Sequence, residues 1–272
     1  KAIVAKLMYR HGVDAVQVLF WRMALAAPLF ALIAWWAGRG KPRLTRREAG
    51  VVVALGFCGY YLASFLDFLG LQYISASLER LILYLNPALV LLLGWLLFGR
   101  RAGWRQGVAM AVGYLGVLLV FGQELSMEGA HVALGAALVF GSTVSYSLYM
   151  VGSGEAVKRL GSLRLTGLAS SVACFFCIAQ LPLLRPLAAV VVPAPVLWLS
   201  LLNATVCTVA PIVMVMMAIE RIGPTLTAQV GMIGPLSTIG MGIVLLGEPF
   251  TPWLAAGTLL VMLGVGLLAR WR

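Results

Sequence analysis

Long apolar runs separated by short polar joints occupy most of this chain. A helix needs about 20 apolar residues to cross a hydrocarbon core of ~30 Å. Nine runs are close to that length or exceed it: Val18–Ala37, Val51–Tyr73, Leu78–Phe98, Gly107–Phe121, Val132–Val151, Gly167–Leu184, Val196–Ile219, Thr225–Leu246 and Trp253–Ala269. A further apolar segment, Lys1–Arg10, is too short to cross a bilayer by itself. The pattern predicts an all-α, polytopic membrane protein.

Composition agrees with this prediction. The 272 residues are 62% hydrophobic and 11% charged, whereas a soluble domain has about 25% charged residues. So few charges cannot cover a water-facing surface, and the lipid bilayer is therefore an expected partner. The net charge of +11 would favour nucleic-acid binding in a soluble protein, but here the basic residues lie in short joints between apolar runs. We therefore expect no nucleic-acid partner.

An internal repeat connects the two halves. At a shift of 148 residues Pro87 aligns with Pro235, Gly99 with Gly247 and Gly116 with Gly264, and glycine and proline report backbone geometry. At a shift of 149, Arg10 aligns with Arg159 and Gly12 with Gly161.

The second half then begins near Val132, which projects to a point before the first residue. We therefore expect ten helices with the first one truncated, as a repeat at 1–121, a linker at 122–131 and a second repeat at 132–272. Five helices per repeat is an odd number, so the repeats should be inverted relative to each other, as in many secondary transporters.

Loop charges predict the orientation. If the joint containing Arg39–Arg47 is cytoplasmic, alternation places fourteen Lys and Arg residues on that side and two, Arg10 and Arg185, on the other. The opposite loop that carries Glu124 and Glu128 has no basic residue. By the positive-inside rule we expect both termini in the cytoplasm.

The sequence contains no signature of enzyme chemistry. Cys174 and Cys177 have C-x-x-C spacing, but they lie in an apolar run, and His11 and His131 stand at helix ends. A zinc site would require four ligands close together. Phosphate-binding loops, H-E-x-x-H and G-x-S-x-G are absent from the sequence. We expect no metal, no cofactor and no catalytic residues.

Several motifs are similar to those of the ten-helix EamA-type exporters of the drug/metabolite transporter superfamily. They are Leu19–Arg22, Ser75–Leu78, Asn86–Pro87, Gly234–Pro235, Leu246–Pro249 and Gly264–Gly266. The pair Gly99-Arg100 departs from the G-E turn that the second half has at Gly247-Glu248. Within the superfamily the chain most resembles the YddG-like exporters of aromatic amino acids and methyl viologen.

The resemblance implies an inner-membrane secondary transporter that exports small metabolites by alternating access. Amino acids, aromatic ones included, are the expected cargo. The alternative on the same fold is a polyspecific exporter of drugs or quaternary cations. An intramembrane enzyme and a scaffold without transport are weaker alternatives, since no nucleophile–base pair is apparent and the repeat favours transport. The sequence does not determine an oligomeric state, and a monomer is the simplest expectation.

Ionisable residues inside a membrane are costly and are candidates for function. Four stand within predicted spans near the outer boundary: Arg22, Asp67, Glu79 and Arg80. We expect Asp67 to pair with Arg22 or Arg80 in a structural lock or outer gate. Asp67 is also the candidate for proton coupling.

Aromatic and polar residues recur on single helical faces of the predicted spans. In the first half these are Tyr60, Tyr61, Phe65 and Tyr84, and in the second Ser142, Tyr146 and Tyr149. We expect Tyr61, Tyr84 and Tyr146 to face a central cavity, because a hydroxyl at mid-span needs a partner or water. Asn203, Met214 and Gln229 are further pathway candidates, and Pro87 and Pro235 are expected to kink equivalent helices.

Overall fold

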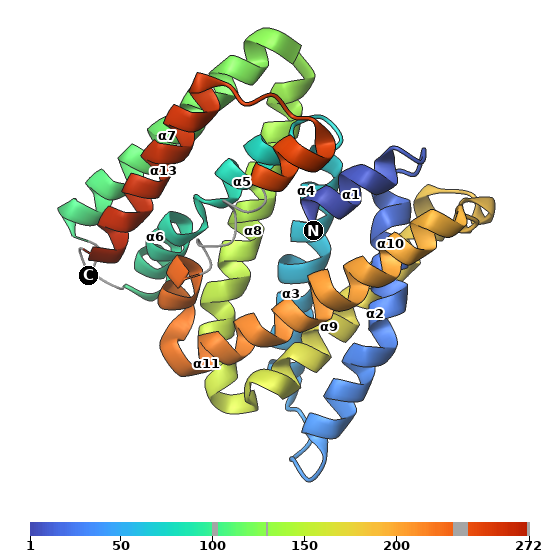
Figure 1. The fold of residues 1–272 in the computed structure, drawn as a ribbon. Helices are drawn as coiled ribbons and strands as arrows, with labels where there is room; N and C mark the ends of the chain where they lie inside the picture. Colours follow the sequence, from blue (N-terminus) through green and yellow to red (C-terminus); the bar gives the residue numbers. More distant parts are fainter. Residues whose placement is uncertain (100–102, 129, 231–238, 271–272) are drawn as a thin grey trace.

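The protein is a helical bundle, seen in a computed structural model that describes residues 1–99, 103–128, 130–230 and 239–270 (Figure 1). These ranges contain helices and no β-strand. The first half contains α1 (Ala2–Tyr9), α2 (Ala15–Gly38), α3 (Arg46–Gly56), η1 (Phe57–Leu62), α4 (Ala63–Gly70), α5 (Ala76–Leu83), α6 (Asn86–Phe98) and α7 (Trp104–Glu128). The second contains α8 (Ala130–Leu160), α9 (Ser162–Leu184), η2 (Leu187–Val190), α10 (Ala194–Ala204), η3 (Thr205–Val209), α11 (Ala210–Val230), η5 (Gly242–Leu246) and α13 (Pro252–Arg270).

Seven helical stretches of the described chain are long and apolar enough to cross a membrane, and they match the first seven predicted runs. The last run corresponds to a shorter apolar helix, Pro252–Leu267. The eighth run, Thr225–Leu246, includes residues 231–238, which lie outside the described residues together with the predicted kink at Pro235. The ten-helix count therefore stays a prediction. Helix α8 continues to Leu160, nine residues past the predicted end at Val151.

Local sequence signals explain where several helices begin. Asp14 and Gln17 form a reciprocal capping box at the start of α2, and Thr45 and Glu48 form another at the start of α3. The Ser75 side chain accepts a hydrogen bond from the Leu78 amide at the start of α5. These caps satisfy amides that the helices leave without internal partners.

Equivalent helices of the two halves pack side by side, α7 against α13 and α2 against α9 (Figure 1). In the first pair a Cβ on Gly116 would lie 2.6 Å from the Gly257 carbonyl oxygen, and a Cβ on Gly264 would lie 2.7 Å from the Ala109 carbonyl oxygen. The 148-residue shift converts one contact into the other, which identifies a pseudo-two-fold axis. The numbering rises along α7 while it falls along α13, so the helices are antiparallel and the axis is perpendicular to them. This is the geometry of an inverted repeat.

Within the described ranges the hydrophobic core consists of two clusters, and each combines both halves. One joins α1 to α4 with α9, α10 and α11, and the other joins α5, α6 and α7 with α13. The long helix α8 contributes to both clusters, through Met150 to the first and Val139 to the second. The repeats are therefore interlocked rather than separate domains.

Two π-helical turns interrupt equivalent helices. η1 starts at Phe57 and η3 starts at Thr205, again 148 residues apart. The left-handed residues Gly99 (φ +63°) and Gly247 (φ +73°), which end α6 and η5, have the same spacing. The repeat read from the sequence is thus present in the backbone, including its irregular places.

Candidate functional site

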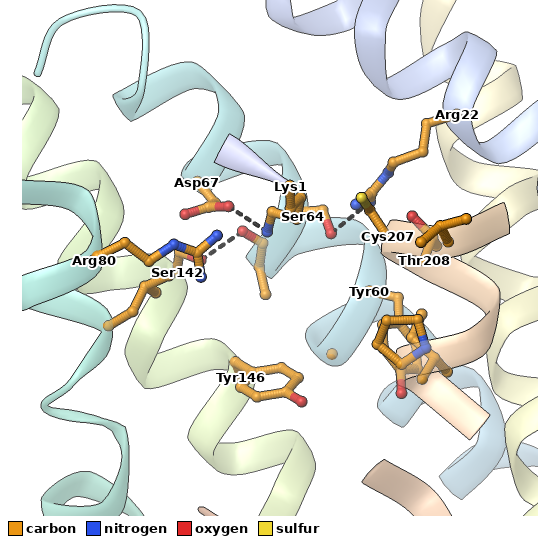
Figure 2. A pocket seen from close by; sticks show the side chains of 16 residues that line it. Lys1, Arg22, Tyr60, Ser64, Asp67, Arg80, Ser142, Tyr146, Cys207 and Thr208 are labelled. Carbon is orange, nitrogen blue, oxygen red and sulfur yellow. Dashed lines mark hydrogen bonds and ion pairs between the residues drawn. The ribbon is translucent and has the colours of Figure 1, made fainter. Parts of the chain in front are cut away.

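A cavity of about 470 Å³ lies between the two halves, where η1 and η3 interrupt their helices (Figure 2). Both π-helical turns stand near the middle of their spans, Arg46–Gly70 and Ala194–Ala228. Mid-membrane irregular backbone is tolerated where it is buried in protein or lines a cavity. The cavity therefore lies near the middle of these spans, where the two halves meet.

The wall of this cavity repeats itself. Its lining residues include Gly59, Tyr60, Ala63 and Ser64 from the first half and Cys207, Thr208, Pro211 and Ile212 from the second. Each residue of the second set is the 148-residue counterpart of one in the first set. The pseudo-two-fold axis therefore passes close to the cavity.

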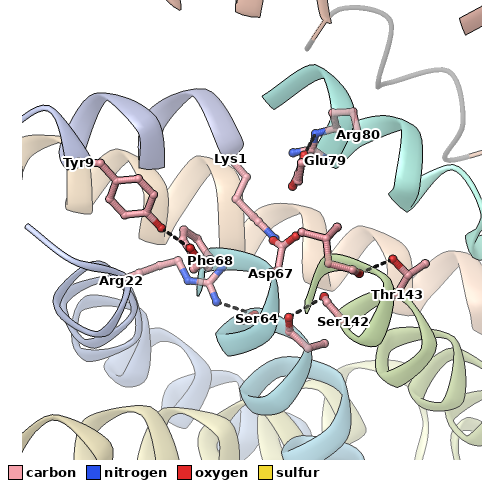
Figure 3. Close-up of polar contacts among 12 residues, drawn as sticks. Lys1, Tyr9, Arg22, Ser64, Asp67, Phe68, Glu79, Arg80, Ser142 and Thr143 are labelled. Carbon is pink, nitrogen blue, oxygen red and sulfur yellow. Dashed lines mark hydrogen bonds and ion pairs between the residues drawn. The ribbon is translucent and has the colours of Figure 1, made fainter. Parts of the chain in front are cut away.

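Charged side chains gather on the first-half side of the cavity. Asp67, on α4, is 1% exposed, and its Oδ2 lies 2.5 Å from Nζ of Lys1 (Figure 3). Arg80, on α5, pairs with its neighbour Glu79, with 3.1 Å between Nε and Oε2. Arg22, on α2, donates a hydrogen bond of 2.8 Å to Oγ of Ser64.

This arrangement corrects the expected pairing of Asp67. Its partner is Lys1 rather than Arg22 or Arg80, because α1 brings Lys1 beside Asp67 while Arg80 is held by Glu79. No sequence signal marked Lys1, which lies in a segment too short to cross the membrane. The charges do meet in one place, and Phe68 packs between two of them, 4.8 Å from Cζ of Arg22 and 5.2 Å from Nζ of Lys1.

A tyrosine cluster forms another part of the cavity wall, with Tyr60 from the first half and Tyr146 from the second. The hydroxyl oxygens of Tyr60 and Tyr149 are 2.5 Å apart, and the ring of Tyr146 stacks on that of Tyr149 at 5.7 Å between centroids. A Cβ on residue 59 would lie 2.3 Å from the Tyr149 ring, so Gly59 is required for this packing. Tyr60 and Tyr146 line the cavity, while Tyr149 supports them from behind.

Ser142 lies on the same wall, and its hydroxyl donates to the Ala63 carbonyl oxygen at 2.6 Å. Ser145 donates in the same way to the carbonyl oxygen of Cys58. Both acceptors lie in or next to η1, so α8 stabilises the π-helical turn that shapes the cavity.

The expected positions of Tyr61 and Tyr84 need correction, because neither lines the cavity. Tyr61 packs against Phe65 and Phe176 on the side of α9. Tyr84 lies against α7 and α13, in the second core cluster. In the first case the cavity face is one residue out of phase with the aromatic stripe. In the second, Tyr84 directly follows the last residue of α5, and its side chain packs in the second core cluster.

Asn203 and Met214, two further pathway candidates, do not line the cavity. Asn203 is completely buried beside η3, and its backbone carbonyl accepts a hydrogen bond from Thr208. Met214 is 68% exposed on the outside of α11. Gln229 belongs to α11, but its side chain lies outside the described residues. Pro87 lies in the first turn of α6, directly after the break between α5 and α6 at Tyr84 and Leu85.

Sequence reasoning missed most second-half residues of the wall. Thr208 and Ile212 carry neither a charge nor an aromatic ring, and those were the features used to select candidate residues within the predicted spans. The signal that identifies them is the repeat itself, since the shift maps Tyr60 and Ser64 onto them.

A second polar contact joins the halves at the end of the bundle where α5 begins. The carboxylate of Glu248 accepts hydrogen bonds from the amides of Ala76 and Ser77, at 2.7 and 3.1 Å, and from the Ser77 hydroxyl at 2.6 Å. A carboxylate at a helix N-terminus also interacts favourably with the helix dipole. The G-E turn of the second half therefore closes onto the first half at this end.

Comparison with known proteins gives consistent results. The model of the EamA-like transporter family matches residues 2–122 and 133–270. The chain is 31% identical to the uncharacterized transporter YcbK of Bacillus subtilis over 91% of this chain and 81% of that protein. It is 25% identical to the S-adenosylmethionine/S-adenosylhomocysteine transporter of Chlamydia muridarum, over 95% and 85% of the two chains.

A solved crystal structure has the same fold, with a TM-score of 0.70 over 99% of this chain and 95% of that one, at 17% identity. The family match spans both halves of the chain, and the interlocked helices agree with it. The protein belongs to the EamA-like transporter family.

Proposed function

We propose that this protein is a secondary transporter that exports small metabolites, aromatic amino acids among them, by alternating access around the mid-span cavity. The observation that carries this proposal is the cavity wall built from equivalent residues of two inverted repeats. Such a site can be exposed to either side by rocking one half against the other.

The chemistry of the wall supports amino acid cargo. Charged side chains stand on one side and tyrosine rings on the other, so a zwitterionic head group and an aromatic ring each meet a suitable surface. The named cargo of the Chlamydia relative, S-adenosylmethionine and S-adenosylhomocysteine, combines an amino acid head group with an aromatic base in the same way.

The alternative function is export of quaternary cations. Asp67 is the one carboxylate among the described residues that line the cavity, and Lys1 already pairs with it. The remaining wall charges are positive, which disfavours a cationic cargo by like-charge repulsion. Amino acid transport is therefore the function that the site supports better.

The test is exchange in proteoliposomes containing the purified full chain. Proteoliposomes loaded with L-phenylalanine should accumulate labelled L-phenylalanine faster than liposomes that contain no protein. Exchange of methyl viologen without any amino acid exchange would favour the alternative. Vesicles loaded with an unrelated sugar serve as the control for leakage.

We also propose that the chain lies in the inner membrane with both termini in the cytoplasm, because the basic joints share one side. On this basis Glu248 closes the outer end. Single cysteines at Arg43 and at Gly122, labelled in intact cells with an impermeant thiol reagent, should differ: labelling at 122 and none at 43 is expected. The reverse pattern would contradict this orientation.

A further inference from the structure

We infer that Arg22 is the binding residue for a carboxylate group of the cargo. This inference rests on the proposed function, since it specifies how a small metabolite is held in the cavity already described. It adds a chemical class: the cargo carries an organic carboxylate, and its head lies toward the first half.

Arg22 is a buried cation on the cavity wall. Its side chain is 3% exposed and extends from α2 toward η1 and η3 (Figure 2). An arginine keeps its charge in proteins, so burial cannot be relieved by loss of the proton. A charge in this position requires a counter-charge or strong hydrogen bonds.

The other charges of the cluster are already paired. Lys1 is bound to Asp67, and Arg80 is bound to Glu79 (Figure 3). Within the residues that the structure describes, no carboxylate lies within ion-pair distance of Arg22. The cluster therefore has one positive charge in excess, and that excess belongs to a residue that lines the cavity.

The guanidinium group has unused hydrogen-bonding capacity. One of its terminal nitrogens donates to Ser64, and Phe68 lies against it, with Cζ 4.8 Å from the ring centroid. Its Nε has no hydrogen-bond partner among the described residues. These two contacts hold the planar fork in position, and a fork of this kind binds a carboxylate through two parallel hydrogen bonds.

The opposite wall determines how the cargo lies. The second-half lining includes Val206, Pro211 and Ile212, which offer no charge, and Tyr146 offers a ring face. Among the described residues, the second-half lining carries no cation, and the hydroxyls of Ser142 and Thr208 already donate to backbone carbonyl oxygens. The apolar or aromatic part of the cargo therefore faces the second half while the carboxylate faces Arg22.

Three related compounds test this arrangement. L-phenylalanine has a carboxylate and an ammonium group, 3-phenylpropanoate has the carboxylate alone, and phenethylamine has the ammonium group alone. In proteoliposomes we expect 3-phenylpropanoate to compete with labelled L-phenylalanine and phenethylamine to compete weakly. Arg22→Gln should raise the half-inhibitory concentration of 3-phenylpropanoate by about tenfold or more, the order expected for loss of a charge-assisted contact. The value for phenethylamine should stay unchanged.

Arg22→Lys should give an intermediate effect, because it keeps the charge and loses the fork. Arg159→Gln is the matched control, since Arg159 is an exposed residue at the end of α8. If Arg22→Gln does not fold, as judged by size-exclusion profile, Arg22→Lys decides: an unchanged half-inhibitory concentration would overturn the inference.

A second readout separates this inference from the proposed function. Thermal stabilisation of the purified protein by 3-phenylpropanoate should occur in the wild type and be lost in Arg22→Gln. If stabilisation follows this pattern but no amino acid is exchanged, the carboxylate site stands and amino acid transport is rejected. If L-phenylalanine is exchanged while both competitors act equally on wild type and Arg22→Gln, Arg22 is a structural residue and the inference fails.

Discussion

The two π-helical segments that meet at the cavity share a backbone and differ in chemistry. From η1 onward the first half presents Tyr60, Ser64 and Asp67, and the 148-residue counterparts from η3 onward are Thr208, Ile212 and Val215. The geometry of the site is therefore duplicated, while its charge is confined to one copy. On the proposed function, the duplicated geometry would allow access from either side, and the one-sided charge would orient the cargo.

The same contrast is present at the ends of the equivalent helices. Gly99 and Gly247 adopt the same left-handed conformation, but Glu248, which follows the second, has Arg100 as its counterpart, and Arg100 lies outside the described residues. Backbone-determining residues are shared by the halves, and residues that make polar contacts are not. Variants at equivalent positions can therefore distinguish residues that determine the backbone conformation from residues that make polar contacts.

The largest effect is expected at Asp67, the charged residue whose equivalent in the second half is Val215. Asp67→Asn leaves the Lys1 ammonium, which is 25% exposed, without its partner, and this should destabilise the protein by about 3 kcal/mol, the lower end of the range for a buried pair. Val215→Asn, at the equivalent position, should cost far less because no ion pair is broken. Folding yield and thermal stability in detergent measure both.

A double variant identifies the partner. Lys1→Met combined with Asp67→Asn should recover much of the lost stability, because both charges are then removed. If stability is recovered when Asp67→Asn is combined with Arg22→Gln or Arg80→Gln instead of Lys1→Met, then Lys1 is not the stabilising partner of Asp67.

The next effect is expected at the contact between the halves made by Glu248. Glu248→Ala removes the acceptor of two α5 amides and the Ser77 hydroxyl, which should cost about 2 kcal/mol. Glu248→Gln retains an acceptor and should cost less. Thermal unfolding of the purified variants measures this difference, and equal stability of Glu248→Ala and wild type would refute the closure.

A smaller effect is expected at the tyrosine wall. Tyr146→Ala should weaken exchange of L-phenylalanine roughly fivefold, since ring contacts contribute about 1 kcal/mol. Tyr146→Phe keeps the ring and should be milder. Tyr84→Phe is the control, because Tyr84 lies in the other core cluster. Normal exchange by a correctly inserted Tyr146→Ala variant would remove Tyr146 from the pathway.

The smallest expected quantity is a difference between two glycine variants. Gly99→Ala and Gly247→Ala each force a Cβ into a left-handed conformation, at about 1 kcal/mol, and neither Cβ meets an atom within 4 Å. Their costs should agree within a few tenths of a kcal/mol, the usual error of additivity. Clearly unequal losses of thermal stability would indicate that the two turns are not equivalent.

The apolar pattern by itself determined the helical class and most of the spans, because bilayer thickness imposes the length of each run. It also determined the repeat. Gly116 and Gly264 were aligned by residue type, and the structure shows why, since each allows its helix to approach a partner closely. Close helix packing requires a residue without a side chain at the contact, so this constraint is visible in the sequence as a glycine.

The composition of the site was decided by tertiary structure. The sequence pattern centred the predicted face on Tyr61 and Phe65, with Tyr60 beside them, whereas the cavity face is the neighbouring polar stripe of Tyr60, Ser64 and Asp67. Periodicity gives the spacing of a face but not its direction, and η1 changes the phase of the helix at this point. Which stripe faces inward depends on the packing of α8 and α9.

The partner of Asp67 was undetermined for a similar reason. The sequence offered Arg22 and Arg80 on predicted spans at comparable depth, and either satisfied the requirement for a buried carboxylate. The choice of Lys1 follows from the position of α1 beside α4 and from the capture of Arg80 by Glu79. The sequence determines how many acidic and basic residues are available to form pairs. Which residues pair depends on the distances between them, and these are defined only when the helices are packed.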